Sequence, residues 1–351
     1  MVLLRVLGIR ALTLLGVLIT VLLLMVILLG ATGFSERTLT AFVGEELRGL
    51  RTSLAETIRD PDELEAVLAE RRGELEQFYG LDDPWYFRLP GDILRVVTLD
   101  LGEAQTLKSS SGSRKVSDII WDRLPNTVLL LLTSLIIIAV IGLAVGVKMA
   151  TIAGSKRDRT VSILSAVSYA LPSWWTGIIL ILVISFYFGL LPSGGMYSTP
   201  PPENGFLRFL DLLKHATLPI ITLVLVSVGP YLYVVRTMTL NVAQEDHVMV
   251  ARAKGLPERT VMRRHILRVA APPIVTGLIF SLVGTLGGSI LVETVFNWRG
   301  MGRLFFDAIA GAAPDEGVIV ALVFVFTLIY VVARLILEVI YLIVDPRVRY
   351  A

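Results

Sequence analysis

Serine residues within apolar stretches are the first candidates for chemistry in this chain of 351 residues. A serine becomes a nucleophile only when a base such as histidine lies beside it. The three histidines, His215, His247 and His265, are absent from the middle of those stretches. The serines concerned are Ser134, Ser162, Ser165, Ser168, Ser185, Ser227 and Ser281. The run Pro192-Ser193-Gly194-Gly195 lies at the end of an apolar stretch, where proline and glycine form ordinary turns. The sequence therefore does not predict an intramembrane hydrolase.

Metal and nucleotide sites are equally unsupported. The chain has no cysteine, and its histidines are far apart, so no cysteine or histidine cluster with metal-ligand spacing is present. It also lacks the pattern Gly-x4-Gly-Lys-Ser/Thr, whose backbone and lysine hold nucleotide phosphates. We expect no cofactor on this chain.

Four charged residues near the ends of apolar stretches are candidates for a translocation path or gate. Glu293 could contact a substrate amine or hold a gate shut through Arg299; the alternative is a carboxylate at a helix end in water. Arg334 and Glu338 are four residues apart and share one helix face. A charge at the centre of a bilayer costs about 2.5–3.5 kcal/mol. A local ion pair near the interface is therefore the first interpretation of Arg334 and Glu338, and a path-lining role is the second.

Residues 246–273 are the most informative stretch of the chain. They are basic and amphipathic and lie between two apolar stretches. Gly255 and Pro257 should break the segment into two short helices, because glycine loses much freedom on ordering and proline lacks an N–H donor. Its first half contains the small residues Ala251, Ala253 and Gly255, which suit docking in a groove of a partner protein. A helix held by anionic lipid, the alternative, would favour larger apolar residues. Aromatic residues do not alternate with the bases, so nucleic-acid binding is not supported.

The composition places the chain in a membrane. Hydrophobic residues make up 54% and charged residues only 18%, whereas soluble domains contain about 25% charged residues. The mean hydropathy is +0.73. Six stretches have the length of about 20 residues that a membrane-spanning helix requires. These predicted spans are residues 11–31, 126–147, 161–190, 216–235, 274–292 and 318–343. The first has too long an apolar run for a secretory signal, and we interpret it as a retained anchor.

Basic residues predict the orientation, because cytoplasmic loops are enriched in lysine and arginine. One set of loops is rich in bases, and the other, which includes 191–215 and 294–317, has few. Both chain ends and residues 246–273 should therefore face the cytoplasm. The bases that decide this are Lys148, Lys156, Arg157, Arg159, Arg236, Arg252, Lys254, Arg259, Arg263, Arg264, Arg268, Arg347 and Arg349.

The long region 32–125 should then lie outside the cell and is on balance acidic. Leucine and valine at positions 64, 67, 68 and 75 recur with helical spacing and predict an amphipathic helix over 61–79. Ser109–Ser113 has the composition of a flexible linker. The region is either a solvated cap or a lip that docks or gates an external binding protein.

Several motifs resemble the permease subunits of ABC importers, in the dipeptide and oligopeptide branch. Residues 251–256, Ala-Arg-Ala-Lys-Gly-Leu, resemble the cytoplasmic coupling loop, called the EAA loop, of that family. The order of the other matching runs extends the resemblance from about residue 75 to the end. These runs are Tyr79–Pro84, Leu124–Thr127, Leu171–Trp174, Gly189–Gly194, Glu293–Phe296, Gly300–Gly302 and Asp345–Tyr350. The sequence departs from the branch after the first span, where the branch has a turn like Pro-Gly-Asp-Pro and this chain has Gly30–Ser35 and an extended insert.

The resemblance implies an all-α membrane protein, a type I ABC importer-like permease with six transmembrane helices and an enlarged first extracytoplasmic loop. The expected parts are an anchor (1–31), the extracytoplasmic region (32–125), a permease core (126–343) with a coupling loop (237–272), and a cytoplasmic tail (344–351). The resemblance assigns ATPase coupling to Asp246, Ala251, Arg252, Ala253, Lys254, Gly255 and Leu256.

The partners implied by the resemblance are two ATPase subunits that bind ATP and magnesium, a second homologous permease and an extracytoplasmic solute-binding protein, in the cell membrane. The expected solute is a dipeptide or oligopeptide. An oligosaccharide or a nickel chelate remains an alternative within the family. A secondary carrier or channel that works without ATPases is the alternative from another class, although such carriers commonly show paired repeats that we do not see here.

Overall fold

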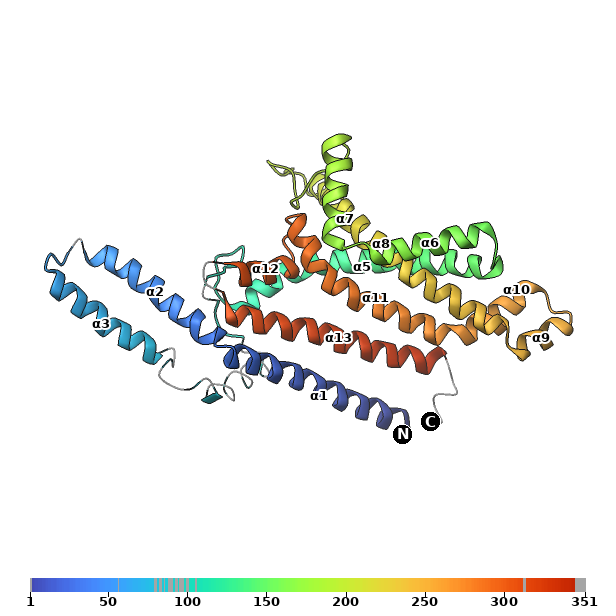
Figure 1. Cartoon of the computed structure of the whole chain (residues 1–351), viewed down its shortest axis with the longest axis horizontal. Coiled ribbons are helices and arrows are strands. Elements are labelled where there is room, and N and C mark those ends of the chain that lie inside the picture. The colour runs from blue at the N-terminus through green and yellow to red at the C-terminus, as the bar shows by residue number, and fades with distance from the viewer. Residues whose placement is uncertain are drawn as a thin grey trace. The chain divides into compact units, whose positions relative to one another are not determined.

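The structure is a computed structural model that describes residues 2–344, except 56, 79–80, 82–83, 85, 88–90, 92–93, 95–97, 99–100, 105 and 312–313. Apart from an isolated bridge between Glu103 and Lys115, regular structure in these residues is helical (Figure 1). The long helices are α1 (Val2–Ala31), α2 (Phe34–Leu54), α3 (Pro61–Phe78), α5 (Val116–Thr151), α6 (Lys156–Ala170), α8 (Gly205–Ala243), α11 (Leu267–Val295) and α13 (Glu316–Val344). The shorter ones are α7 (Ser173–Leu180), η1 (Ile181–Tyr187), α9 (Asp246–Ala253), α10 (Glu258–Thr260), η2 (Val261–Ile266) and α12 (Met301–Ala310).

The prediction of six spans agrees with the helices, with one correction. Five described helices are long and apolar enough to cross a membrane, and a bent pair brings the number to 6. That pair, α6 with α7 and η1, replaces the single helix predicted over 161–190 and is bent by 102°. Leu171 and Pro172 have extended backbone angles between the two helices. The predicted continuous helix is therefore wrong. Proline favours a break at this point, because it disfavours a helical conformation in the residue before it and donates no hydrogen bond.

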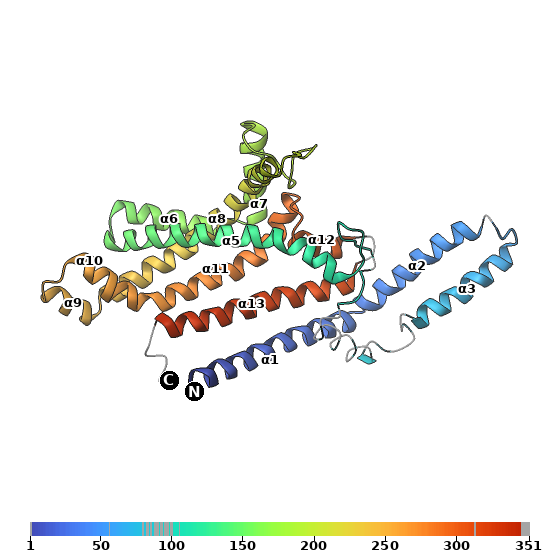
Figure 2. The ribbon, with the colours of Figure 1, turned by 180° about the vertical axis from the view of Figure 1, so that it is seen from behind.

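The chain divides into two compact units, each described by itself. The first comprises residues 1–11, 123–304 and 330–351. In it, α8 packs against α6, α7 and α11, and Figures 1 and 2 show α5 alongside these helices. Its buried core includes Leu130, Ile138, Leu223 and Val235. Glycines permit close approach: a Cβ on Gly146 of α5 would lie 2.7 Å from Val235 of α8.

The second unit comprises residues 12–122 and 305–329. Helices α2 and α3 form an antiparallel pair (Figures 1 and 2) around a core that contains Val43, Leu47, Leu68 and Leu75. The predicted helix over 61–79 is confirmed as α3, whereas α2 was not predicted. A second core joins α1 to the first half of α13 through Leu22, Val26 and Phe324.

The predicted linker Ser109–Ser113 is a hydrogen-bonded turn, so this prediction is wrong. The N–H of Ser109 donates to the carbonyl of Ser113 (2.9 Å), and the hydroxyl of Ser110 donates to Asp122 Oδ1 (2.8 Å). Serine hydroxyls readily bond to nearby backbone and carboxylate groups, which composition alone does not reveal. The turn leads into α5, which begins at Val116, inside the region predicted as 32–125. Most of the motif at 79–84 and the tail from 345 onward lie outside the described residues.

Candidate coupling surface and charged clusters

The candidate coupling segment, residues 246–265, begins just after the end of α8. After Gln244 and Glu245, α9 runs over Asp246–Ala253. Gly255 follows with φ of +74°, a left-handed conformation in which other residues are strained, and α10 begins directly after Pro257. The predicted break at Gly255 and Pro257 is therefore confirmed. The second helix is not a short separate one, because α10 continues through η2 into α11. Figures 1 and 2 show α9 and α10 at one end of the long helices of their unit.

Contacts on both sides of the turn hold this segment in place. Val248 and Ala251 of α9 are buried with Val261 of η2 in the core of the unit. His247 Nε2 lies 3.0 Å from the carbonyl oxygen of His265, which joins α9 to η2. Across the turn, Arg252 donates to both carboxylate oxygens of Glu258 at 2.8 and 3.2 Å.

The bond from Arg252 to Glu258 fixes the shape of the turn more than it stabilises the protein. The Glu258 carboxylate raises the pKa of the Arg252 guanidinium, so the pair stays charged. Both side chains are largely exposed, and exposed pairs contribute about 0–1 kcal/mol.

The predicted coupling residues divide between an inner and an outer face. Ala251 is only 4% exposed and packs into its own chain. The other predicted residues, Asp246, Arg252, Ala253, Lys254, Gly255 and Leu256, are exposed. Met249 and Val250, which were not predicted, are 57% and 52% exposed and extend the outer face with apolar area. The result is a small, rigid projection with a mixed apolar and basic surface.

Glu293 lies in a buried polar cluster at the other end of α11. Its carboxylate is fully buried and accepts hydrogen bonds from the Thr127 hydroxyl (2.8 Å) and the N–H of Arg303 (3.0 Å). The Thr127 oxygen in turn accepts from the N–H of Met301 (2.7 Å). Glu293 and Thr127 thus satisfy N–H groups in the first turn of α12, which have no partner within the helix. A Cβ on Gly300 would lie 2.5 Å from Thr127 Oγ1, so the cluster also requires glycine at this position.

The geometry changes the interpretation of Glu293. Its carboxylate is not in water, which contradicts the alternative of a solvated helix end. Among the described residues, its hydrogen-bond partners are Thr127 and the first turn of α12, and the exposed side chain of Arg299 is not one of them. The backbone carbonyl of Arg299 does join the cluster, because it accepts from Asn126 Nδ2 at 2.7 Å. The indole N–H of the buried Trp298 donates to the carbonyl of Asn126 (3.1 Å) and completes the link between α5 and this turn.

Arg334 and Glu338 form the ion pair that their spacing suggested. Arg334 Nη2 lies 3.5 Å from Glu338 Oε1, and Arg10 Nη1 lies 3.8 Å from the same oxygen. The Glu338 side chain is only 14% exposed and lies between two arginines, one from α13 and one from α1. This arrangement fits the first interpretation, a local pair, and the two arginines together compensate the carboxylate.

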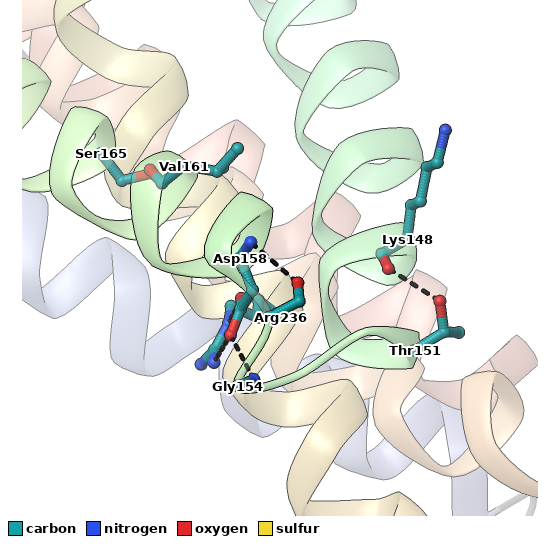
Figure 3. A network of polar contacts seen from close by, with 8 residues as sticks. Lys148, Thr151, Gly154, Asp158, Val161, Ser165 and Arg236 are labelled. Atoms are coloured by element: carbon teal, nitrogen blue, oxygen red, sulfur yellow. Dashed lines mark hydrogen bonds and ion pairs between the residues drawn. The ribbon is translucent and has the colours of Figure 1, made fainter.

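A further ion pair joins α6 and α8 and was not predicted. Asp158 is 3% exposed, and its two carboxylate oxygens accept from Nε and Nη2 of Arg236 at 2.5 and 2.6 Å (Figure 3). The partners are 78 residues apart, and each looks in the sequence like one more charge in a basic loop or at the end of a span. A buried acid within Lys156–Arg159 gives no periodic signal, so only the fold reveals the pair.

Comparison with protein families identifies the architecture. Residues 140–350 match the family described as "Binding-protein-dependent transport system inner membrane component". The match covers more than half of the chain and includes α8, the candidate coupling segment and Glu293. This chain belongs to that family.

Curated relatives of this family member are permease proteins of peptide systems. It is 35% identical over 282 residues to the oligopeptide transport system permease protein AppB of Bacillus subtilis. The alignment covers 80% of this chain and 86% of that relative. It is 30% identical over 305 residues to the dipeptide transport system permease protein DppB of Escherichia coli, with coverage of 81% and 87%.

A solved transporter shares the fold. The structure of an inward-facing MetNI methionine ABC transporter aligns with a TM-score of 0.54 and 18% identity, over 66% of this chain and 99% of the solved one. Part of this chain is thus unmatched by that fold. The family match and the peptide-permease relatives make this chain a multi-pass membrane permease subunit of an ABC importer, a class of transporter that works in general with ATPases and a binding protein.

Proposed function

We propose that this permease imports dipeptides or oligopeptides and takes the energy of ATP hydrolysis from partner ATPases through residues 246–265. A second homologous permease subunit would enclose the other half of the path, and two ATPase subunits would bind the ATP and magnesium. The observation that carries this proposal is the coupling segment, a short exposed helix held rigidly at one end of the spanning helices. The relatives at 35% and 30% identity are permeases for oligopeptides and dipeptides, which supports peptides as the solute.

The shape of the coupling segment supports docking on a protein groove. Its outer face combines Met249, Val250 and Leu256, which would be buried on docking, with Arg252 and Lys254, which would meet acidic groups. Burial of apolar area contributes about 25 cal/mol per Å². Because α9 follows α8 after only two residues, a displacement of α9 would move the end of α8. Closing of the ATPases on ATP would in this way rock the spans between inward- and outward-open states.

The charged candidates take different parts in this proposal. Glu293 would brace the outer end of the path by fixing α12 to α5 and α11, rather than by pairing with the Arg299 side chain. Arg334 and Glu338, together with Arg10, would form an interfacial brace near the cytoplasmic ends of α13 and α1. Both chain ends would lie in the cytoplasm, and α2 and α3 would lie outside, where they are available to the binding protein.

Uptake into proteoliposomes tests the proposal. The complex of this permease with its ATPases and second permease is reconstituted with ATP enclosed on the ATPase side and the binding protein outside. We expect accumulation of tritiated trialanine that requires both ATP and the binding protein. Uptake of maltotriose or nickel–histidine in place of trialanine would refute the peptide assignment alone. Uptake by this chain without ATPases or ATP would refute the importer mechanism and favour a carrier.

A further inference from the structure

The buried ion pair between Asp158 and Arg236 is the strongest polar contact between spanning helices that the proposed function leaves unexplained. The Arg236 guanidinium donates to both carboxylate oxygens of Asp158 (Figure 3). This bidentate geometry fixes the relative orientation of the two side chains as well as their distance. Asp158 is 3% exposed, and the Arg236 side chain is 17% exposed. Such a pair is costly to desolvate, and stability alone explains it poorly, because apolar residues of similar size often stabilise as well or better.

The residues before Asp158 position its carboxylate against α8. Gly154 has φ of +81° and turns the chain between α5 and α6, and its N–H donates to Asp158 Oδ2 at 3.0 Å. Ser155 is the N-cap of α6 and accepts from the N–H of Asp158 at 3.2 Å. The carboxylate thus belongs at once to the turn, to the start of α6 and, through Arg236, to α8.

The position of Arg236 connects the pair to the coupling segment. Arg236 lies in the last two turns or so of α8, which ends at Ala243, and α9 begins at Asp246. The connection between α8 and α9 is tight: the N–H groups of Gln244 and Glu245 donate to the carbonyls of Asn241 and Val242. A displacement of α9 therefore reaches Arg236 through continuous helix and one short turn.

The other end of α6 carries the displacement to the broken span. Ser168 donates to the carbonyl of Leu225, and the N–H of Gly229 donates to Ser168 Oγ at 3.3 Å. A Cβ on Gly229 would lie 2.7 Å from the carbonyl of Ser165, so the two backbones are in direct contact there. Helix α6 is thus attached to α8 at both ends, and it leads straight to the 102° bend before α7.

We infer that Asp158 and Arg236 are positioning residues for energy coupling: they make α6, and with it the bend at Leu171–Pro172, move with α8 when the coupling segment moves. This inference rests on the proposed coupling role of residues 246–265. The pair touches neither solute nor ATPase, and it acts through α6 and α8. Loss of the pair should weaken the stimulation of ATP hydrolysis by the binding protein. ATP hydrolysis itself and docking of the binding protein should both persist.

The test separates coupling from folding by removing the charges singly and together. Asp158→Asn or Arg236→Gln alone leaves an uncompensated buried charge, which damages folding. The double variant Asp158→Asn with Arg236→Gln leaves two neutral groups that can hydrogen-bond to each other, so it should insert and assemble. Arg159→Gln, which removes an exposed charge one residue after Asp158 on α6, is the matched control.

Each complex is purified in nanodiscs, and ATP hydrolysis is measured with and without the binding protein as isolated with its own solute. We expect basal hydrolysis to persist in the double variant, while stimulation by the binding protein falls by about tenfold, within the range of coupling between distant sites. Arg159→Gln should match the wild type.

Three results would overturn the inference: wild-type stimulation in the double variant, an equal loss in Arg159→Gln, or failure of the double variant to assemble, which would make the pair a folding element only. Absence of stimulation in the wild-type complex would instead count against the proposed function.

Discussion

At the scale of single residues, the fold turns Glu293 from a solvated helix end into a buried acceptor. Its two carboxylate oxygens accept hydrogen bonds from the Thr127 hydroxyl and the Arg303 N–H. These two donors lie at the junction of α5, α11 and α12. A buried donor that loses its acceptor costs about 1–3 kcal/mol, and more when the acceptor was charged. Stability of this junction therefore depends on the carboxylate itself.

Replacement of Glu293 by glutamine should accordingly lower the thermal midpoint of the purified protein. The amide offers one acceptor in place of two and would point an N–H₂ group at either Thr127 or the α12 backbone, so we expect a loss of about 1–3 kcal/mol in unfolding free energy. Thermal unfolding in detergent, followed by fluorescence size-exclusion chromatography, measures the shift. Arg299→Gln is the control, because its exposed side chain is outside the cluster while its carbonyl is retained. A gate closed by a bond from Glu293 to the Arg299 side chain would instead make both variants equally unstable.

Gly255 is the second residue whose environment decides its tolerance. Its φ of +74° disfavours most side chains, but no atom lies within 4 Å of a Cβ placed there. Asparagine tolerates this conformation, so Gly255→Asn should keep the turn and the ATPases. Gly255→Trp should insert normally, because the space around it is open, yet lose at least about tenfold in ATPase co-purification, which corresponds to 1.4 kcal/mol. Retention of the ATPases by the tryptophan variant would refute docking at this turn.

At the scale of elements, the bend between α6 and α7 is the main departure from what the sequence predicted. Apolar length over 161–190 favours a continuous span, and proline is tolerated in many membrane helices, so Pro172 alone does not decide between a kink and a break. Contacts from α8 and α11 to α7 decide it. The absence of cysteine from the chain makes the bend easy to measure.

Spin labels on cysteines introduced at the exposed positions Ile163 and Ile179 should lie much closer together than in a straight helix. Sixteen residues of straight helix span about 24 Å. With the 102° bend, we expect double electron–electron resonance to give a clearly shorter distance between the two spin labels. A pair at Leu132 and Val140, exposed on the continuous helix α5, calibrates the straight case at about 12 Å for eight residues. A distance of about 24 Å or more between positions 163 and 179 would contradict the bend.

The same scale shows why α3 was predicted and α2 was not. In α3, Leu64, Leu68 and Leu75 carry the helical period and all pack in the hairpin core. In α2, Val43, Leu47 and Leu50 carry the same period, but Gly44 and Gly49 interrupt it and lower its helix propensity. The signal was present and weak. No comparable signal exists for the Ser109–Ser113 turn, whose order comes from Asp118 and Asp122 of α5.

At the scale of the whole molecule, the fold class and the family followed from the order of short motifs and from apolar length. The break at Gly255 and Pro257 was also predictable, because glycine and proline act locally. The partners of Glu293 and the pair of Asp158 with Arg236 were not, since these contacts join residues 166 and 78 positions apart. Contacts of this kind depend on helix packing, which local periodicity does not specify.

The proposed topology predicts opposite accessibility for two exposed positions. Cysteines introduced at Ser111, before α5, and at Lys156, at the start of α6, should face opposite sides of the membrane. We expect a membrane-impermeant maleimide to label position 111 in intact cells and position 156 only after permeabilisation, because the bases around Lys156 favour the cytoplasm. Labelling of position 156 in intact cells would reverse the orientation.

Native mass spectrometry of the tagged chain, extracted from its own membranes in mild detergent, shows whether this permease works with ATPases through its coupling segment. We predict a complex of this chain with two ATPase subunits and a second permease, to which the binding protein binds. The complex should lose both ATPases, but keep the second permease, when the chain carries Gly255→Trp. Recovery of the chain alone, or a complete complex with the tryptophan variant, would contradict this prediction.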